Sequence, residues 1–404
     1  MERIRSKVSL AWIPILAVGV LCSLGQAQSD KTGAIDGVYR GTIGKRQIVL
    51  EIGAPKKPHE RFSDNGPAAE VMGWYFYRQH GVGILLEGSF LEDGSLRLHE
   101  YSSQFGERKR NGAEWRLWFQ GNAGAGFFCR CDVRRQTRSA NPDLKISLAR
   151  VSEPDDPVRT LDKLYDDLLL DYPLRSSAEI MVNAKAGYVI QADERFKVGL
   201  PQLTHFPDAK VMERVNSDLA RKLKQTRLDA AACLEGSGQK DGMWDESVRV
   251  AVFSDTILSI VRQTGYDCVG TVHPDAATEA FVYDMRTGAA LDLKDFFEGQ
   301  DTSAVLEDGA VPQGPTHDLL MELYRRHYVK PRDCDSAGDF TVDNFDSTTT
   351  LKIYFDHTGL VISPELPHAI AGCGPEITIP YQELRPFLRK EWQSRAPLNV
   401  WSRQ

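Results

Sequence analysis

The stretch GTVHPDAATEAFVYDMRTGAALDLKDFF, Gly270 to Phe297, decides how the C-terminal half of this chain folds. It contains His-Pro-Asp, Tyr-Asp and Arg-Thr-Gly sequences, whose polar side chains also occur in catalytic sites. Thr287-Gly288 is nevertheless typical of a hairpin turn that needs the conformational freedom of glycine, and His273-Pro274 fixes a second turn. The two leucines and two phenylalanines that follow are typical of a buried segment. We therefore predict that this stretch is structural scaffold rather than an active site.

The residues on either side of this stretch predict a mixture of strands and helices. Asp208 is expected to cap a helix whose apolar face carries Val211, Val215 and Leu219. Further elements are expected at these places: strands at 248–253 and 257–264, helices at about 316–328 and 384–392, and a hairpin turning at His357-Thr358-Gly359. Strands and helices do not alternate as regular βαβ units, so we predict an α+β domain.

Residues 37–150 carry a different pattern, made of short runs rich in Val, Ile, Tyr, Phe and Trp. Turn sequences such as Glu92-Asp93-Gly94 separate most of the runs, and many runs alternate polar with apolar residues. Up to eight strands are predicted, in an antiparallel all-β meander that forms a barrel or a sandwich. In Trp74-Tyr75-Phe76-Tyr77 the two tyrosines share one face, and we interpret the run as aromatic filling of a small barrel core rather than a sugar-stacking surface.

The N-terminus predicts export. Arg3, Arg5 and Lys7 precede an apolar run at residues 8–24, and Ala27 is the small residue that a signal peptidase requires. We predict a signal peptide at 1–27, a β-meander domain at 34–150, a linker and connecting helix at 151–177, and an α+β domain at 178–395. The mature chain is expected to be periplasmic or secreted, with no stable membrane span after signal cleavage.

Six cysteines remain after the signal peptide, an even number that predicts disulfides in an oxidising compartment. We expect the pairs Cys233–Cys268 and Cys334–Cys373, because each pair lies within one stretch of the C-terminal domain. Cys129 and Cys131 lie two residues apart on an expected strand, which is too far for an unstrained bridge. They either stay reduced or cross-link elsewhere.

Charge divides the chain into two unequal halves. Residues 28–150 contain 19 Lys and Arg against 14 Asp and Glu, whereas residues 151–404 contain 27 against 41, a net charge of −14. A strongly acidic domain attracts cations and basic proteins. It also argues against a nucleic-acid partner.

Short patterns that resemble catalytic motifs do not form a complete set. Ser237-x-x-Lys240, Ser63-Asp64-Asn65 and Lys31-Thr32-Gly33 match penicillin-binding protein motifs, but in the reverse order. The acidic segment 333–344 resembles a calcium loop but has Ala and Asn where two carboxylates are needed. We therefore expect no catalytic residue, no metal and no cofactor.

A family resemblance rests on the following groups: Gly270 to Pro274, Val282 to Gly288, Leu291 to Phe297, Leu200-Pro201-Gln202-Leu203 with Asn216, Gly359 to Gly372, and Ile379-Pro380-Tyr381 with Leu384. Together they resemble the RsiV-like extracytoplasmic domain over roughly residues 178–390. That family includes the outer domain of a lysozyme-sensing anti-sigma factor and a domain that accompanies peptidoglycan deacetylases. The resemblance implies a non-catalytic binding module outside the cytoplasm.

We therefore predict a non-catalytic cell-envelope protein that binds a cell-wall polymer or a basic wall-associated protein such as lysozyme. The alternatives are a wall hydrolase or other serine-type enzyme, and a small-molecule carrier that uses the β-barrel. Proline-fixed loops lose little entropy on binding and therefore suit recognition. The expected contact residues lie on two such loops: His273, Pro274, Pro364, Glu365, Pro367 and His368.

Overall fold

The computed structural model describes residues 33–54, 69–104, 107–132, 137–138, 144–151, 161–235, 242–268, 274–299, 308–332, 334, 345, 349–366 and 368–394. The predicted signal peptide lies outside these residues. The chain folds as two compact units, one of residues 1–171 with 235–238 and the other of residues 172–234 with 239–404. Each unit is described by itself.

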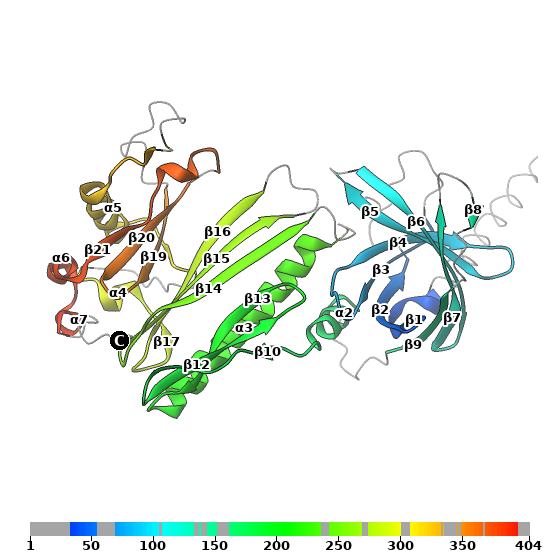
Figure 1. The fold of residues 1–404 in the computed structure, drawn as a ribbon, viewed down its shortest axis with the longest axis horizontal. Helices are drawn as coiled ribbons and strands as arrows, with labels where there is room; N and C mark the ends of the chain where they lie inside the picture. The colour runs from blue at the N-terminus through cyan, green and yellow to red at the C-terminus, as the bar shows by residue number, and fades with distance from the viewer. Residues whose placement is uncertain are drawn as a thin grey trace, which may run out of the picture. The chain divides into compact units, whose positions relative to one another are not determined.

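The N-terminal unit is an antiparallel β-barrel of eight strands (Figure 1). These are β1 (Gly37–Ile43), β2 (Arg46–Gly53), β3 (Val71–Tyr77), β4 (Ile84–Phe90), β5 (Leu96–Gln104), β6 (Glu107–Gln120), β7 (Ala123–Asp132) and β9 (Leu144–Arg150). Neighbouring strands pair from β1 to β6, while β9 joins β1 to β7 and the pairing of β6 with β7 closes the barrel. The short β8 (Thr137–Arg138) pairs with β7. The predicted meander is confirmed, and it is a barrel.

Aromatic side chains fill the described part of the barrel interior, as the alternation in β3 predicted. Tyr75 is buried there with Trp115, and Tyr77 packs against the same core. Phe76 points outward and meets Tyr165 of α2 (Leu161–Leu170), with ring centroids 5.1 Å apart. The remaining members of this core are mostly aliphatic and come from all eight strands.

Glu100 is a charged residue inside this apolar core. Its carboxylate accepts hydrogen bonds from the hydroxyl of Tyr75 and, at 3.2 Å, from the indole N–H of Trp115. Buried polar groups of this kind are tolerated when they are hydrogen-bonded. Glu100 therefore connects β3, β5 and β6 across the interior.

The C-terminal unit contains three four-stranded antiparallel sheets and is α+β, as predicted. The first sheet contains β10 (Arg175–Ser176), β11 (Ile180–Asn183), β12 (Ala186–Asp193) and β13 (Val198–His205). The second contains β14 (Met243–Phe253), β15 (Ile257–Asp267), β16 (Asp275–Asp284) and β17 (Ala289–Ala290). The third contains β18 (Ala310–Val311), β19 (Thr350–Phe355), β20 (Gly359–Glu365) and β21 (Ile377–Pro380).

Helices connect and cover these sheets. They are α3 (Ala209–Leu234), α4 (Leu293–Phe296), α5 (Pro315–His327), α6 (Tyr381–Leu384) and α7 (Lys390–Gln393), with 3₁₀ turns at His368–Cys373 and Arg385–Phe387. The predicted cap of α3 is present, because the Asp208 carboxylate accepts hydrogen bonds from the backbone N–H groups of Lys210 and Val211. Val215 and Leu219 are buried on its apolar face.

The segment from Tyr283 to Phe297 is scaffold, as its sequence indicates. Gly288 has a φ of 73°, and a Cβ there would lie 2.9 Å from the carbonyl oxygen of Val211, so the turn requires glycine. The leucines and phenylalanines that follow it are buried in the largest apolar core of this unit. Asp284 accepts hydrogen bonds from the backbone and the guanidinium of Arg286, so both polar residues serve the turn.

Both predicted disulfides are formed, Cys233–Cys268 and Cys334–Cys373. They indicate an oxidising, extracytoplasmic location. Cys129 lies half-buried on β7, and the side chain of Cys131 is not among those described. Among the described helices, none is both long and apolar enough to cross a membrane.

Candidate functional site

The six predicted contact residues have different surroundings. His273 and Pro367 lie outside the described residues, as does the side chain of His368. Pro274 is exposed directly before β16, and Glu365 is exposed at the end of β20. Pro364 is buried within β20, where it is paired with Leu351 of β19. Of the described members, Pro274 and Glu365 are therefore the two that a partner can reach.

These two residues border one surface at the end of the second sheet. Trp244, Tyr266 and Asp275 lie directly opposite one another on β14, β15 and β16, so they share a face. Trp244 and Tyr266 stack with ring centroids 5.8 Å apart. Burial raises the pKa of Tyr266, and the carboxylates of Asp275 and Glu365 raise it further. We call Trp244, Tyr266, Pro274, Asp275 and Glu365 the Tyr266 surface.

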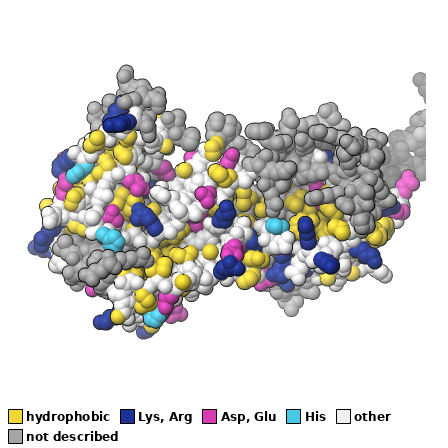
Figure 2. All heavy atoms as spheres, viewed as in Figure 1, with side chains coloured by type: hydrophobic (Ala, Val, Ile, Leu, Met, Phe, Trp, Pro, Cys, Tyr) yellow, Lys and Arg dark blue, Asp and Glu magenta, His cyan; other side chains and the backbone are white. Residues whose placement is uncertain are grey.

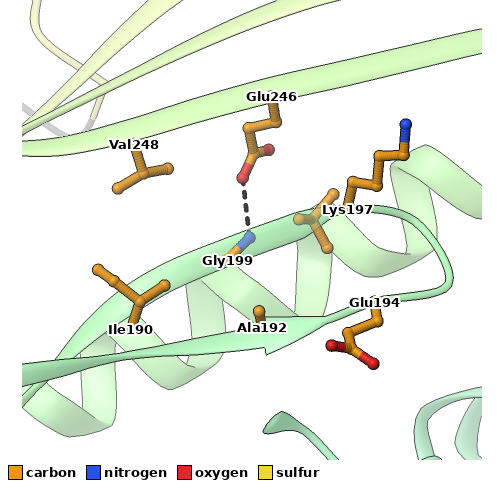
Figure 3. A pocket seen from close by; sticks show the side chains of 8 residues that line it. Ile190, Ala192, Glu194, Lys197, Gly199, Glu246 and Val248 are labelled. Atoms are coloured by element: carbon orange, nitrogen blue, oxygen red, sulfur yellow. Dashed lines mark hydrogen bonds between the residues drawn. The ribbon is translucent and has the colours of Figure 1, made fainter. Parts of the chain in front are cut away.

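One row further along the same face, Glu246 of β14 points toward the outer edge of β13 (Figure 3). Its Oε1 accepts a hydrogen bond of 3.0 Å from the backbone N–H of Gly199. Asn216 of α3 bonds the same edge of β13, accepting from the N–H of Leu203 and donating to its carbonyl oxygen. Pro201 between them has no N–H to donate. Side chains, rather than another strand, thus satisfy this edge of the sheet.

A pocket of about 420 Å³ lies beside this contact. Ile190, Ala192, Val198 and Val248 form its apolar wall, with Gly199 and Glu246 in the wall and Glu194 and Lys197 at its exposed margin. Glu246 and Val248 come from β14, and the others come from β12, β13 and the turn that joins them (Figure 3). The pocket therefore combines aliphatic walls with one deeply buried carboxylate.

Glu246 has an incomplete set of partners. Its side chain is 1% exposed, and its Oε2 accepts no hydrogen bond from the described residues. The Nε of Arg262 approaches that oxygen to 4.0 Å, but Arg262 donates to Glu279 and to Thr226 instead. The carboxylates of Glu246 and Glu279 therefore both lie near the guanidinium of Arg262. Burial is the largest cause that raises the pKa of Glu246, to about 7, and Glu279 raises it further against the opposing effects of Gly199, Arg262 and the indole N–H of Trp244.

Asp193, at the end of β12, shows how a buried carboxylate in this unit is fully satisfied. It accepts hydrogen bonds from the backbone and side chain of Arg195 and from the side chain of Arg227. Burial opposes its ionisation, but the two arginines hold the pKa of Asp193 below its usual value. Asp193 and its two arginines therefore form a structural ion cluster, whereas Oε2 of Glu246 has no hydrogen bond from the described residues.

A second pocket, of about 350 Å³, adjoins the first because both are lined by Ile190 and Val248. Its other walls are aliphatic residues of β11 and β14 together with Tyr188 of β12 and Phe253 of β14, and Arg249 and His357 add polar groups. The two pockets form a groove between the first and second sheets of this unit. Lys197, at one end of the groove, has a φ of 57°, the only positive φ of a non-glycine residue in the described part of the chain.

Most of the motifs that suggested chemistry lie outside the described residues. These include Ser237 with Lys240, Ser63-Asp64-Asn65, Lys31 and Thr32, and nearly all of the acidic segment 333–344. Within the described ranges, no group of three or more His, Cys, Asp or Glu residues could hold a metal ion. Glu246 was not predicted from the sequence. Its signal is in WDESVRV, where Trp244, Val248 and Val250 alternate with polar residues and Glu246 is the polar residue at an apolar position of that alternation.

The charges of the C-terminal unit are interspersed on the face drawn in Figure 2, where Lys and Arg side chains lie among Asp and Glu. The net charge of −14 over residues 151–404 therefore does not appear on that face as one acidic patch. The Tyr266 surface and the pocket lined by Glu246 are therefore better indicators of a binding partner than the net charge is.

Comparisons with known proteins find only low sequence identity. No family model matches the chain, and no curated protein matches it. A crystal structure of a member of the DUF3298 family from Bacteroides fragilis is similar over 54% of this chain and 95% of that chain, with 15% identity and a TM-score of 0.33. This is a distant structural similarity over about half of the chain.

Proposed function

We propose that this chain is a periplasmic or secreted, non-catalytic binding protein of the cell envelope, and that residues 178–395 form an RsiV-like domain. Its partner in this proposal is a basic wall-associated protein such as a lysozyme, or a cell-wall polymer. The two disulfides support a location outside the cytoplasm.

The observation that carries the proposal is the Tyr266 surface. It places the stacked Trp244 and Tyr266 beside two exposed carboxylates, those of Asp275 and Glu365. Aromatic side chains are enriched at binding interfaces, and carboxylates at the rim attract a cationic partner and raise its association rate. The Cys233–Cys268 disulfide lies directly beyond the end of β15 and restrains this end of the sheet. Restrained surfaces lose less entropy on binding.

The test measures binding of the oxidised mature chain to lysozyme, as a basic protein probe, and to isolated cell-wall sacculi. Asp275→Asn with Glu365→Gln should slow association with lysozyme by about tenfold at low salt, and the difference should shrink at high salt. The control is Glu213→Gln with Asp255→Asn, which removes the same charge from exposed positions on α3 and in the β14–β15 turn. Equal slowing by both double variants would exclude the Tyr266 surface as the contact, and turnover of sacculi would replace the proposal with an enzyme.

A further inference from the structure

We propose that the pocket formed by β12, β13 and β14 binds an aliphatic ammonium group, with Glu246 as its counter-charge. The ligand chemistry is a primary amine on a short hydrocarbon stem, either a free alkylamine or a lysine side chain. The pocket adjoins the Tyr266 surface, because Trp244 and Glu246 lie on the same face of β14 and the indole N–H of Trp244 acts on the Glu246 carboxylate. The proposal does not depend on a wall protein being the partner.

The shape and lining of the pocket define the stem of this ligand. Ile190, Ala192, Val198 and Val248 supply aliphatic wall on the way to the carboxylate, and the pocket holds about 420 Å³. Burial of each methylene against such a wall contributes about 0.8 kcal/mol. A ligand that is charged along its whole length would leave this apolar surface unused.

The partners of Glu246 define the head of the ligand. Oε1 is held by Gly199, while Oε2 is buried without a hydrogen bond from the described residues. A buried acceptor without a partner is costly, and an ammonium group is a compact donor of three hydrogen bonds. A neutral alcohol can donate one hydrogen bond but brings no charge.

The surrounding charges select a cation rather than an anion. Arg262 and Glu279 face Glu246 from β15 and β16 and neutralise each other, so the carboxylate of Glu246 is left as excess negative charge. At the margin, Glu194 is paired with Arg175, and Lys197 has no ion pair among the residues that the structure describes. Lys197 is therefore the competitor of an entering ammonium group, and its removal is part of the test.

The experiment titrates the oxidised mature chain with n-butylamine, N-acetyl-lysine amide and the neutral analogue n-butanol, followed by NMR. At about pH 8.5 the amine is expected to bind at least about tenfold more tightly than butanol. Since Glu246 must be ionised and its pKa is about 7, amine affinity should fall about 30-fold between about pH 8.5 and pH 5.5. Tight binding of the lysine amide assigns the site to a peptide, and binding of butylamine alone assigns it to a free amine.

Variants separate this proposal from general surface charge. Glu246→Gln keeps an acceptor for Gly199 but should reduce amine affinity to that of butanol and remove its pH dependence. Glu213→Gln, an exposed carboxylate on α3 that does not line the pocket, should change amine affinity by no more than about twofold. Lys197→Met should strengthen amine binding. The proposal is overturned if butanol binds as well as the amine, if Glu246→Gln binds the amine normally, or if the amine binds only after Lys197→Met, which would make Lys197 the native occupant.

Discussion

Replacing Glu246 by Gln should stabilise the protein in alkaline solution and leave it unchanged in acid. The folded-state pKa of Glu246 is raised from 4.5 to about 7. The protonated carboxyl therefore stabilises the fold fully below about pH 4.5, and that stability is lost as the pH rises through about 7. At about 1.4 kcal/mol per pKa unit, the loss approaches about 3 kcal/mol above pH 7. Gln at this position resembles the protonated acid, because it is neutral and its Oε1 can still accept from Gly199.

The measurement is calorimetric unfolding of the oxidised mature chain and of Glu246→Gln at about pH 4 and about pH 8.5. We expect equal midpoints at the lower pH and a midpoint about 6 to 12 °C higher for the variant at the higher pH, from about 2 to 4 °C per kcal/mol. Glu213→Gln, an exposed carboxylate on α3, serves as the control and should show no difference that depends on pH. A variant that is less stable by the same amount at both pH values would refute the reasoning, because it would mean that Glu246 is ionised and paired in the folded protein.

Three further predictions concern stability. Glu100→Leu leaves two buried donors in the barrel without an acceptor, and it should lower the free energy of unfolding by about 2 to 4 kcal/mol in a denaturant titration. Cys334→Ala with Cys373→Ala opens a loop with a sequence separation of 39 and should cost about 4 kcal/mol by the chain-entropy model, whereas the reduced parent chain loses both disulfides and should lose about twice as much. Glycine adopts the positive φ of position 197 without strain, so Lys197→Gly should raise the unfolding midpoint by the equivalent of about 1 kcal/mol. A decrease would mean that the Lys197 side chain stabilises the turn.

Local patterns in the sequence predicted the parts of the fold that depend on local physics. The alternation in β3 predicted that Tyr75 and Tyr77 share a face and that aromatic residues fill the barrel, but not which face points inward. Asp208 predicted the start of α3. Proximity along the chain was enough to predict both disulfides. Closure of the meander into a barrel was not predicted over a sandwich, because it depends on the pairing of β7 with both β6 and β9.

The candidate site was harder to predict because its residues are distant in the sequence. Glu246 and Gly199 are 47 residues apart, and nothing near either residue indicates that they meet. The proline-containing loops were predicted as contacts from their rigidity, yet Pro364 is buried within β20. Rigidity of the backbone is a local property that sequence reveals, whereas exposure depends on how three separate sheets pack.

The outer edge of β13 explains why Glu246 lies where only one of its oxygens is hydrogen-bonded by the described residues. An exposed strand edge invites pairing with other chains, and here Pro201, Asn216 and Glu246 block it without adding a strand. Only one oxygen of Glu246 is used in this way, so the other is left in the pocket. The hydrogen bond to Gly199 and the proposed contact with a ligand can therefore be separated by substitution. Glu246→Gln removes the charge and keeps the hydrogen bond to Gly199, whereas Glu246→Ala removes both and should be less stable than Glu246→Gln at every pH.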